Sequence, residues 1–321
     1  MSRTSRSHSR QLALAMVTLV SLPLVASGQG RLSTASRAEF DAALAANGGR
    51  VIVTLQPVGG VAGLRAEGQP AVSGTEVDRI ALRLKAGAKL RTATPLYLIG
   101  GLAVKANEIQ IDSLLGDPNV DLIEPDRISW MQDEQPVGAL REQPGLHSGA
   151  QTVPWGIDRV QAQEAWAVVG QGAGVKVGIM DSGGDRDHPD LLWAGGYNAM
   201  TFSTSSSAWD DDVASCNGHG THVAGTVAAR DNSEGVVGVA PAVSLYALKV
   251  FELIDGDCGA WVSSQIGALN WAVTNGIRVV NVSIGGESSA GAYRIAITNA
   301  AAVGTYMVAA AGNTGGSMLF P

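Results

Sequence analysis

Basic residues are scarce in this sequence. Its 321 residues include 22 lysines and arginines against 29 aspartates and glutamates, which gives a formal net charge of −7. A protein that binds a phosphate backbone needs a concentrated positive field, and this chain has little positive charge to supply one. Nucleic acid is therefore not an expected partner.

Aromatic residues are also few, at 5% of the chain, and no residue pattern repeats at a fixed period. The missing period excludes collagen and solenoid repeats. Hydrophobic residues nevertheless make up 45% of the chain against 16% charged, so a large core can be buried and general disorder is excluded. With 41 glycines, the composition is typical of a compact enzyme with glycine-rich loops.

Long apolar runs are missing except for one, from Leu12 to Ala26, which follows Arg3, Arg6 and Arg10. A positive start, an apolar stretch of this length and small residues at its end are the three parts of a secretory signal, and the run is short for a membrane span. We expect residues 1–28 to be removed and the remainder to be secreted to the extracellular space without a membrane anchor. A retained anchor is the alternative.

Cysteine is nearly absent, with only Cys216 and Cys258 in the chain. In an exported protein these two residues can form one disulfide. Cys216, His219 and His222 also have a spacing that suits zinc. Because a fourth ligand and the glutamate of an HExxH helix are missing, zinc is the weaker hypothesis.

Residues 29–149 have the pattern of a small α+β domain and a linker, with the folded part at about 48–130. We expect strands at Arg50–Pro57, within Leu96–Ala106 and at Val120–Ile123, and helices at Glu76–Lys85 and Asn107–Leu115. The alternating order predicts a ferredoxin-like arrangement. The polar, irregular stretch from Asp126 to Ala150 is typical of an exposed linker that is easily cleaved.

Residues 150–321 change to hydrophobic strands that alternate with helices. The apolar runs are Val175–Met180, Ser244–Val250, Ile277–Ile284 and Thr305–Ala311, and helical spacing is present at Ser263–Asn275 and Ala292–Val303. Continuous apolar strands indicate a parallel sheet covered on both faces, so we predict a doubly wound α/β domain. Catalytic residues gather at the carboxyl ends of such strands, which here means Asp181, Ser283–Gly286 and Gly312–Asn313.

Two of these features have plain structural alternatives. A lone Asp181 after a strand is more often a turn residue. The segment Gly170-x-Gly172-x-Gly174 resembles a dinucleotide loop, but it precedes its strand and is better explained as a turn. His219, in contrast, has glycines on both sides, which allow close backbone approach beside a cleft.

Five segments in order, DSGGDRDHPDL, NGHGTHVAGTVAA, GVVGVAP, NVSIGG and AAAGN, resemble the subtilisin family of serine endopeptidases. The resemblance runs from about Ala150 to the last residue, and the preceding stretch, which ends in LIEPD, is similar to the family's inhibitory propeptide. It implies an Asp-His-Ser triad with Asp181 as its carboxylate and His219 as general base. His222 would be a structural neighbour, and Asn313 the donor to the oxyanion.

The resemblance also implies how substrate binds. It places Ser283, Ile284 and Gly285 on one wall of the primary specificity pocket, and Ala311 and Gly312 on another. A peptide or protein substrate would add as an extended strand beside Ser283–Gly285 and beside Gly256–Ala260, with preference for a large apolar side chain. The protein's own propeptide would act as intramolecular inhibitor and chaperone.

A structural calcium site and a disulfide follow from the same resemblance. The calcium ligands would be the side chains of Gln151, Asp190 and Asn232 and the carbonyls of Arg230, Glu234 and Val236. The pairing of Cys216 with Cys258 resembles the bridge of aqualysin-like members.

The family's nucleophile lies in a GTSMA-like stretch well beyond the oxyanion asparagine, whereas this sequence stops at Pro321. Gly316-Ser317-Met318 is similar in letters only, because it directly follows the oxyanion segment. We therefore interpret the sequence as the first part of a secreted, monomeric subtilisin-like proprotease that is inactive without its serine. The alternative is a non-catalytic secreted protein, either a peptide-binding pseudoprotease or a propeptide-type inhibitor.

Overall fold

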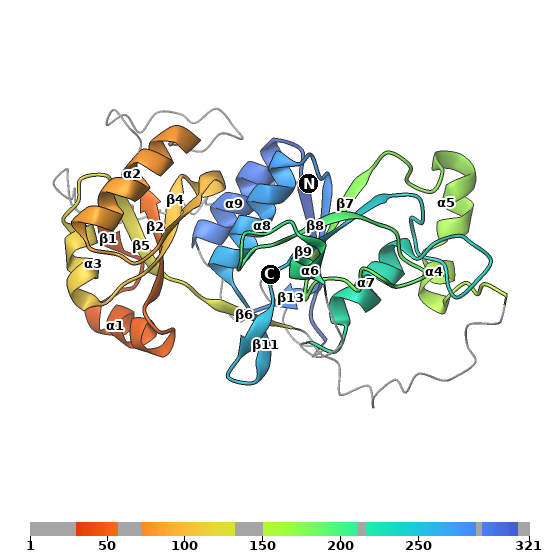
Figure 1. Cartoon of the computed structure of the whole chain (residues 1–321), viewed down its shortest axis with the longest axis horizontal. Coiled ribbons are helices and arrows are strands. Elements are labelled where there is room, and N and C mark those ends of the chain that lie inside the picture. Colours follow the sequence, from red (N-terminus) through yellow and green to blue (C-terminus); the bar gives the residue numbers. More distant parts are fainter. Residues whose placement is uncertain (1–29, 57–71, 132–149, 211–215, 287–290, 314–321) are drawn as a thin grey trace, which may run out of the picture.

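The computed structural model describes residues 30–56, 72–131, 150–210, 216–286 and 291–313 (Figure 1). The expected signal and residues 132–149 of the expected linker lie outside these ranges. Within them, no helix is long and apolar enough to cross a membrane. We call residues 30–125 the N-terminal unit and residues 150–313 the C-terminal unit.

The N-terminal unit is built on a five-stranded sheet in the order β1-β5-β2-β4-β3. Its elements are β1 (Arg31–Leu32), α1 (Arg37–Ala46), β2 (Arg50–Leu55), α2 (Gly74–Gly87), β3 (Ala93–Leu96), β4 (Gly101–Lys105), α3 (Glu108–Leu115) and β5 (Val120–Pro125). β1 pairs parallel with β5, and the other neighbours pair antiparallel. From β2 onward, the order β-α-β-β-α-β is that of the predicted ferredoxin-like fold.

The three helices of this unit cover one face of its sheet. Each begins at a polar residue, Ser36, Ser73 or Asn107, whose side chain accepts a hydrogen bond from a backbone N–H in the first turn. Their apolar faces meet the sheet in one continuous core that includes the fully buried Phe40 and Leu102. Burying this apolar area is the main contribution to the unit's stability.

Two details differ from the sequence-based expectation. The segment Leu96–Ala106, predicted as one strand, is interrupted by a 3₁₀ turn at Tyr97–Ile99. Gly100 follows with φ of 59°, a conformation that glycine adopts without strain, so the chain reverses there between β3 and β4. Helix α1 also lies before the expected folded part, so the unit is larger than predicted.

The C-terminal unit contains a five-stranded sheet in the order β14-β12-β7-β9-β8. The strands are β7 (Lys176–Asp181), β8 (Trp193–Asn198), β9 (Ser244–Lys249), β12 (Val279–Val282) and β14 (Tyr306–Ala309). All neighbouring pairs are parallel. The predicted α/β fold class is thereby confirmed.

Helices cover this sheet on both faces. The helices of the unit are α4 (Trp155–Arg159), α5 (Ala162–Val169), α6 (Ser206–Trp209), α7 (His219–Ala228), α8 (Val262–Thr274) and α9 (Gly291–Ala302). Alternate residues of β7 join different cores: Met180 packs with α8 and α9, whereas Ile179 packs with α7. In Figure 1, α8 and α9 lie between the sheet and the N-terminal unit.

A third, smaller sheet joins the two units. Its order is β10-β11-β6-β13, and all its pairs are antiparallel. The strands are β6 (Ile128–Met131), β10 (Glu252–Ile254), β11 (Asp257–Trp261) and β13 (Ile284–Gly285). The prediction of an irregular linker from Asp126 is therefore wrong for residues 128–131, because partners distant in sequence complete their backbone hydrogen bonds.

The units also meet through two buried carboxylates. Asp126 accepts from the Ser263 backbone N–H at 3.0 Å and the Ser263 hydroxyl at 2.6 Å, at the start of α8. Glu124 accepts from the Ala292 N–H at 3.1 Å, at the start of α9. Both helix N-termini, which carry partial positive charge, are thus capped by carboxylates at the end of the N-terminal unit and directly after it. Burial raises the pKa of both carboxyls.

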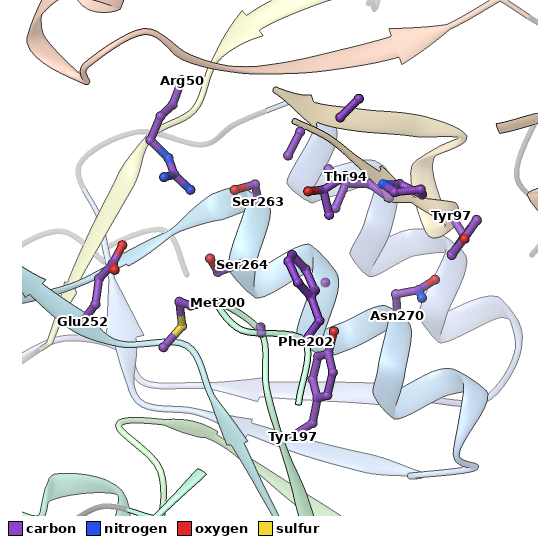
Figure 2. A pocket seen from close by; sticks show the side chains of 16 residues that line it. Arg50, Thr94, Tyr97, Tyr197, Met200, Phe202, Glu252, Ser263, Ser264 and Asn270 are labelled. Atoms are coloured by element: carbon purple, nitrogen blue, oxygen red, sulfur yellow. The ribbon is translucent and has the colours of Figure 1, made fainter. Parts of the chain in front are cut away.

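A cavity of about 510 Å³ lies at this junction. Figure 2 shows Arg50 and Thr94 of the N-terminal unit on one side, with Glu252, Ser263 and Asn270 of the C-terminal unit below and around it. Neither Asp181 nor His219 lines the cavity, so it is separate from the predicted catalytic residues.

Candidate active site

Asp181 and His219 lie side by side although they are far apart in sequence. Asp181 is the last residue of β7 and is fully buried, and His219 is the first residue of α7. The distance between His219 Nδ1 and Asp181 Oδ1 is 2.7 Å, and the histidine side chain keeps 19% of its surface exposed. The buried carboxylate can therefore hold the imidazole, while the ring still reaches solvent.

Close packing of two turns produces this arrangement. A Cβ added to Gly220 would lie 2.2 Å from the carbonyl oxygen of Gly183, so only glycine fits there. The Gly220 N–H donates to the Ser182 hydroxyl at 2.9 Å, which fixes the first turn of α7 against the end of β7. The glycine after His219 thus sets the distance between base and carboxylate.

Only one oxygen of the Asp181 carboxylate has hydrogen-bond partners among the described residues. Its Oδ1 accepts from both the imidazole and the Ser182 N–H, the latter at 2.7 Å. Its Oδ2 is buried and has no hydrogen-bond partner among the described residues. A buried negative group of this kind stabilises an imidazolium more strongly than one exposed to water, because the local dielectric constant is low.

The other predicted site residues follow the ends of neighbouring strands. Val282 of β12 pairs with Met180 of β7 and with Ala309 of β14, so the residues that follow these three strands reach the same edge of the sheet. Ser283 and Ala311 follow β12 and β14, and Asn313 is exposed at the end of this region. The predicted roles of Ser283, Ile284, Gly285, Ala311, Gly312 and Asn313 remain predictions. Gly316-Ser317-Met318 lies outside the described residues.

β6 occupies a groove between β11 and β13. Trp130 of β6 pairs with Gly259 of β11 on one side and with Gly285 of β13 on the other. These are the two segments beside which the sequence resemblance places an extended substrate. An extended segment of the chain itself therefore lies where a substrate peptide is expected.

Cys216 and Cys258 form a disulfide in the structure. It joins the residue that precedes α7 by a short turn to the strand β11, and thus ties the histidine segment to the groove. Since Cys216 is part of a disulfide, its sulfur is not available as a thiolate for zinc. The zinc hypothesis with His219 and His222 is therefore wrong for this state of the protein.

The six predicted calcium ligands lie together. Gln151 Nε2 lies 3.2 Å from the Val236 carbonyl oxygen and 3.5 Å from that of Glu234, and it also donates to the Arg230 carbonyl. Asp190 accepts from Asn232 Nδ2 at 3.0 Å and from the Val236 N–H at 3.1 Å. Three carbonyls thus converge on one side-chain amide next to a carboxylate.

This set of residues fits calcium chemically. A half-turn of the Gln151 and Asn232 amides exchanges nitrogen for oxygen, so both can present oxygen where they now present N–H groups. Neutral carbonyls with one carboxylate are hard ligands of the kind calcium takes. Within the described residues, no group of three or more His, Cys, Asp and Glu side chains could hold a metal, and this set is not of that kind because only Asp190 contributes a carboxylate.

Sequence reasoning missed three residues that the structure places at this groove or at the helices beneath it. Glu124 and Asp126 belong to the LIEPD segment, but their capping roles depend on helices more than 100 residues away, so no local signal reveals them. Gln265 is fully buried below β6, within a helix that is otherwise largely apolar. A polar residue on the buried face of that helix was the available signal.

The sequence is similar to those of known proteins. Residues 172–319 match the Subtilase family. The chain is 46% identical to Subtilisin DY of Bacillus licheniformis over 52% of this chain and 58% of that protein. It is 35% identical to Subtilisin E of Bacillus subtilis over 68% of this chain and 51% of that protein, and 40% identical to an alkaline protease of Shouchella clausii over 62% and 50%. The chain thus spans about half the length of these relatives.

The fold is similar to that of a solved structure, fervidolysin from Fervidobacterium pennivorans, which is described as a keratinolytic enzyme related to subtilisin. The TM-score is 0.61 with 23% sequence identity, over 91% of this chain and 43% of that one. The likeness covers both units, so it supports the arrangement of the N-terminal unit against the α/β sheet.

Proposed function

Through residues 172–319 this chain belongs to the subtilase family, and on that premise we propose that it is the N-terminal part of a secreted serine endopeptidase precursor. Residues 1–28 would direct export, the N-terminal unit would be the inhibitory propeptide, and the C-terminal unit would begin the peptidase domain. The observation that carries this proposal is β6, which lies between β11 and β13 in the sheet whose strands flank the expected substrate position.

In this proposal, His219 acts as the general base. A serine hydroxyl is too weak an acid to attack an amide unaided, so a neighbouring imidazole must take its proton. Because Nδ1 makes the hydrogen bond to Asp181, Nε2 is the ring nitrogen that would receive the proton. Asp181 then stabilises the imidazolium that forms. We expect the serine in the part of the relatives' length that this chain does not span.

Asn313 is proposed to stabilise the negative oxygen of the tetrahedral intermediate. Its place after β14, at the same sheet edge as Asp181, supports this role. A neutral amide donor does not have to lose a charge's hydration before it acts. For subtilisin itself, such a side chain contributes about 3 to 4 kcal/mol to the transition state.

β6 is proposed to act as an intramolecular inhibitor. A strand held on both edges by backbone hydrogen bonds prevents another peptide from using the same edges. The caps that Asp126 and Glu124 provide to α8 and α9 fix the position of this segment from its N-terminal side. Activation then requires a cut after β6 and departure of the N-terminal unit.

Calcium is proposed as a structural ion bound by Gln151, Asp190, Asn232 and the three carbonyls near them. When bound, it supplies positive charge that neutralises Asp190 and links residues 150–152 to the loop at residues 230–236. The convergence of carbonyls on Gln151 supports the proposal.

The test uses the protein encoded by the complete gene, which we call the full-length protein. We expect it to hydrolyse peptide bonds and to be inactivated by a serine-directed phosphonate or sulfonyl fluoride. His219→Ala should lower kcat by a factor on the order of 10⁶, as known for subtilisins. His222→Ala, an exposed histidine on the same helix, is the matched control and should change kcat little.

Three outcomes would contradict this proposal. A full-length protein that binds peptides without cleaving them would be a pseudoprotease, and one that blocks other proteases without activity of its own would be an inhibitor. Equal activity of wild type and His219→Ala would exclude His219 as the base. For residues 1–321 alone, we expect no peptidase activity above background.

A further inference from the structure

Gln265 has an unusual position for a polar residue. It lies on α8 with no exposed surface, below the groove that β6 occupies. Its Nε2 donates to the Ser129 hydroxyl at 3.1 Å and to the Ala260 carbonyl at 3.2 Å. Its Oε1 is buried and has no hydrogen-bond partner among the described residues. Among the described residues, the carboxamide therefore makes its hydrogen bonds through its nitrogen alone.

The side chains of β6 alternate in direction, so only some of them face Gln265. A Cβ added to Gly259 would lie 2.8 Å from Ile128 and 2.9 Å from Trp130, so both side chains lie on the same face of this sheet. Ser129, between them, is buried and points the other way, to Gln265. One position of any strand in this groove thus rests on the carboxamide.

The Ala260 carbonyl fixes the orientation of the Gln265 amide. Because that carbonyl can only accept, it holds Nε2 toward β11 and β6, and Oε1 points elsewhere in the buried space. A side chain at the Ser129 position must therefore accept from Nε2, and a hydroxyl does so within a small volume.

We propose that Gln265 is a specificity-determining residue, which selects substrates with a small hydroxyl side chain, serine or threonine, at the place of Ser129. The inference rests on the proposed function, in which a substrate takes the place of β6. A leucine there would leave the Nε2 hydrogen that now points to Ser129 buried without an acceptor, and buried polar groups without partners are costly. An aspartate would bury a charge, which costs more.

The first test asks whether Gln265 and Ser129 act as a pair within the intact chain. It uses the full-length protein with His219→Ala, which keeps β6 attached, and follows backbone hydrogen exchange at residues 128–131. Ser129→Leu should speed this exchange at least about tenfold when Gln265 is present. With Gln265→Leu, or Gln265→Met as a second variant of similar shape, the same change should have little effect. Ile128→Leu is the control, because Ile128 faces away from Gln265.

The second test measures selection among substrates. Peptides with the sequence of residues 126–136 carry Ser, Thr, Ala or Leu at position 129, and the activated full-length enzyme cleaves them. We expect kcat/KM for serine to exceed that for leucine at least about tenfold, and Gln265→Leu and Gln265→Met to reverse the order. Because the readout is a ratio between peptides, a general loss of activity in a variant does not affect it.

The outcomes separate this inference from the proposed function. If Ser129→Leu speeds exchange equally with and without Gln265, or if the peptide ratio is unchanged by both substitutions, Gln265 is only a structural residue and the inference is wrong. If exchange shows the coupling while no peptide is cleaved, Gln265 still selects the residue at position 129 of β6, and the proposed peptidase function fails.

Discussion

The two units of this protein differ in how completely their apolar side chains are buried. In the N-terminal unit, helices cover one face of the sheet, and the other face packs on α8 and α9 of the C-terminal unit. In the C-terminal unit, the face toward α7 has a smaller core, and exposed apolar side chains remain on α5 and on the edge strand β14. Val168 is 84% exposed, Val169 77% and Val308 56%.

The difference in packing follows the proposed division of function between the two units. The unit proposed to inhibit has a complete core. Within the described residues, the unit that carries Asp181 and His219 has exposed apolar side chains, and β14 is an edge strand of its sheet. Such surfaces mark contact sites or aggregation hazards. Since the chain spans about half of its relatives' length, we propose that the rest of the relatives' length covers these faces.

The largest effect is expected from a substitution that leaves a cavity in the core of the N-terminal unit. Phe40 is fully buried among α1 and the sheet, so Phe40→Ala should lower the free energy of unfolding of that unit by about 3–5 kcal/mol. Val308→Ala should change the free energy of unfolding of the other unit by less than about 0.5 kcal/mol, because Val308 is exposed in residues 1–321. Hydrogen exchange of each unit in a protein limited to residues 1–321 measures both. Similar losses would mean that the C-terminal unit is as well packed as the other.

The next largest effect is expected from the disulfide, which strengthens the less complete unit. Its cysteines are 42 residues apart, and restriction of the unfolded chain by such a loop stabilises the fold by about 4 kcal/mol in the loop-entropy model. Replacing both cysteines by serine should lower the melting temperature of the full-length protein. Thiol titration of denatured, unreduced protein should find no free thiol, and two reactive thiols would refute the bridge.

Calcium should stabilise the C-terminal unit by a smaller amount. An ion present at 100 times its dissociation constant adds about 2.7 kcal/mol to a folded state that alone binds it. A chelator should therefore lower the melting temperature of the full-length protein, and Asp190→Asn should remove most of the chelator's effect. No shift with chelator would contradict the calcium site.

The smallest effect concerns the pH dependence of the N-terminal unit. Arg83 pairs with Asp117 at 2.8 Å and lowers the pKa of that carboxyl to about 2. Because the pKa of the folded state lies below that of the unfolded chain, the stabilisation is complete above pH 4 and is lost as the pH falls toward 2. It amounts to less than about 2 kcal/mol, since water screens the half-exposed Arg83. Asp117→Asn should reduce the change in the free energy of unfolding between pH 4 and pH 2, measured by denaturant unfolding at each pH. An unchanged pH dependence would show that other carboxyl groups determine it.

How much the sequence predicts depends on the distance over which each signal acts. The apolar runs predicted β7, β9 and β12, because a strand that is buried on both faces consists almost entirely of apolar residues. The glycines around His219 pointed to a close backbone contact, which Gly220 makes with Gly183. These features were predictable because each is encoded within a few residues.

Features that depend on distant partners could not be predicted in this way. The strand β6 forms only because β11 and β13 lie on its two sides, and its four residues, Ile128–Met131, are too few to show a period of their own. The roles of Asp126 and Gln265 likewise depend on contacts between segments more than 100 residues apart. Hydrogen-bond partners at such separations leave no periodic trace in the sequence.

Self-processing of the full-length protein tests the central claim most directly, because it requires both the seated β6 and the Asp181–His219 pair. Mass spectrometry of the purified protein should find the wild type cut within residues 132–149, just after β6, and the His219→Ala variant uncut. The same cut at the same rate in both proteins would contradict the account.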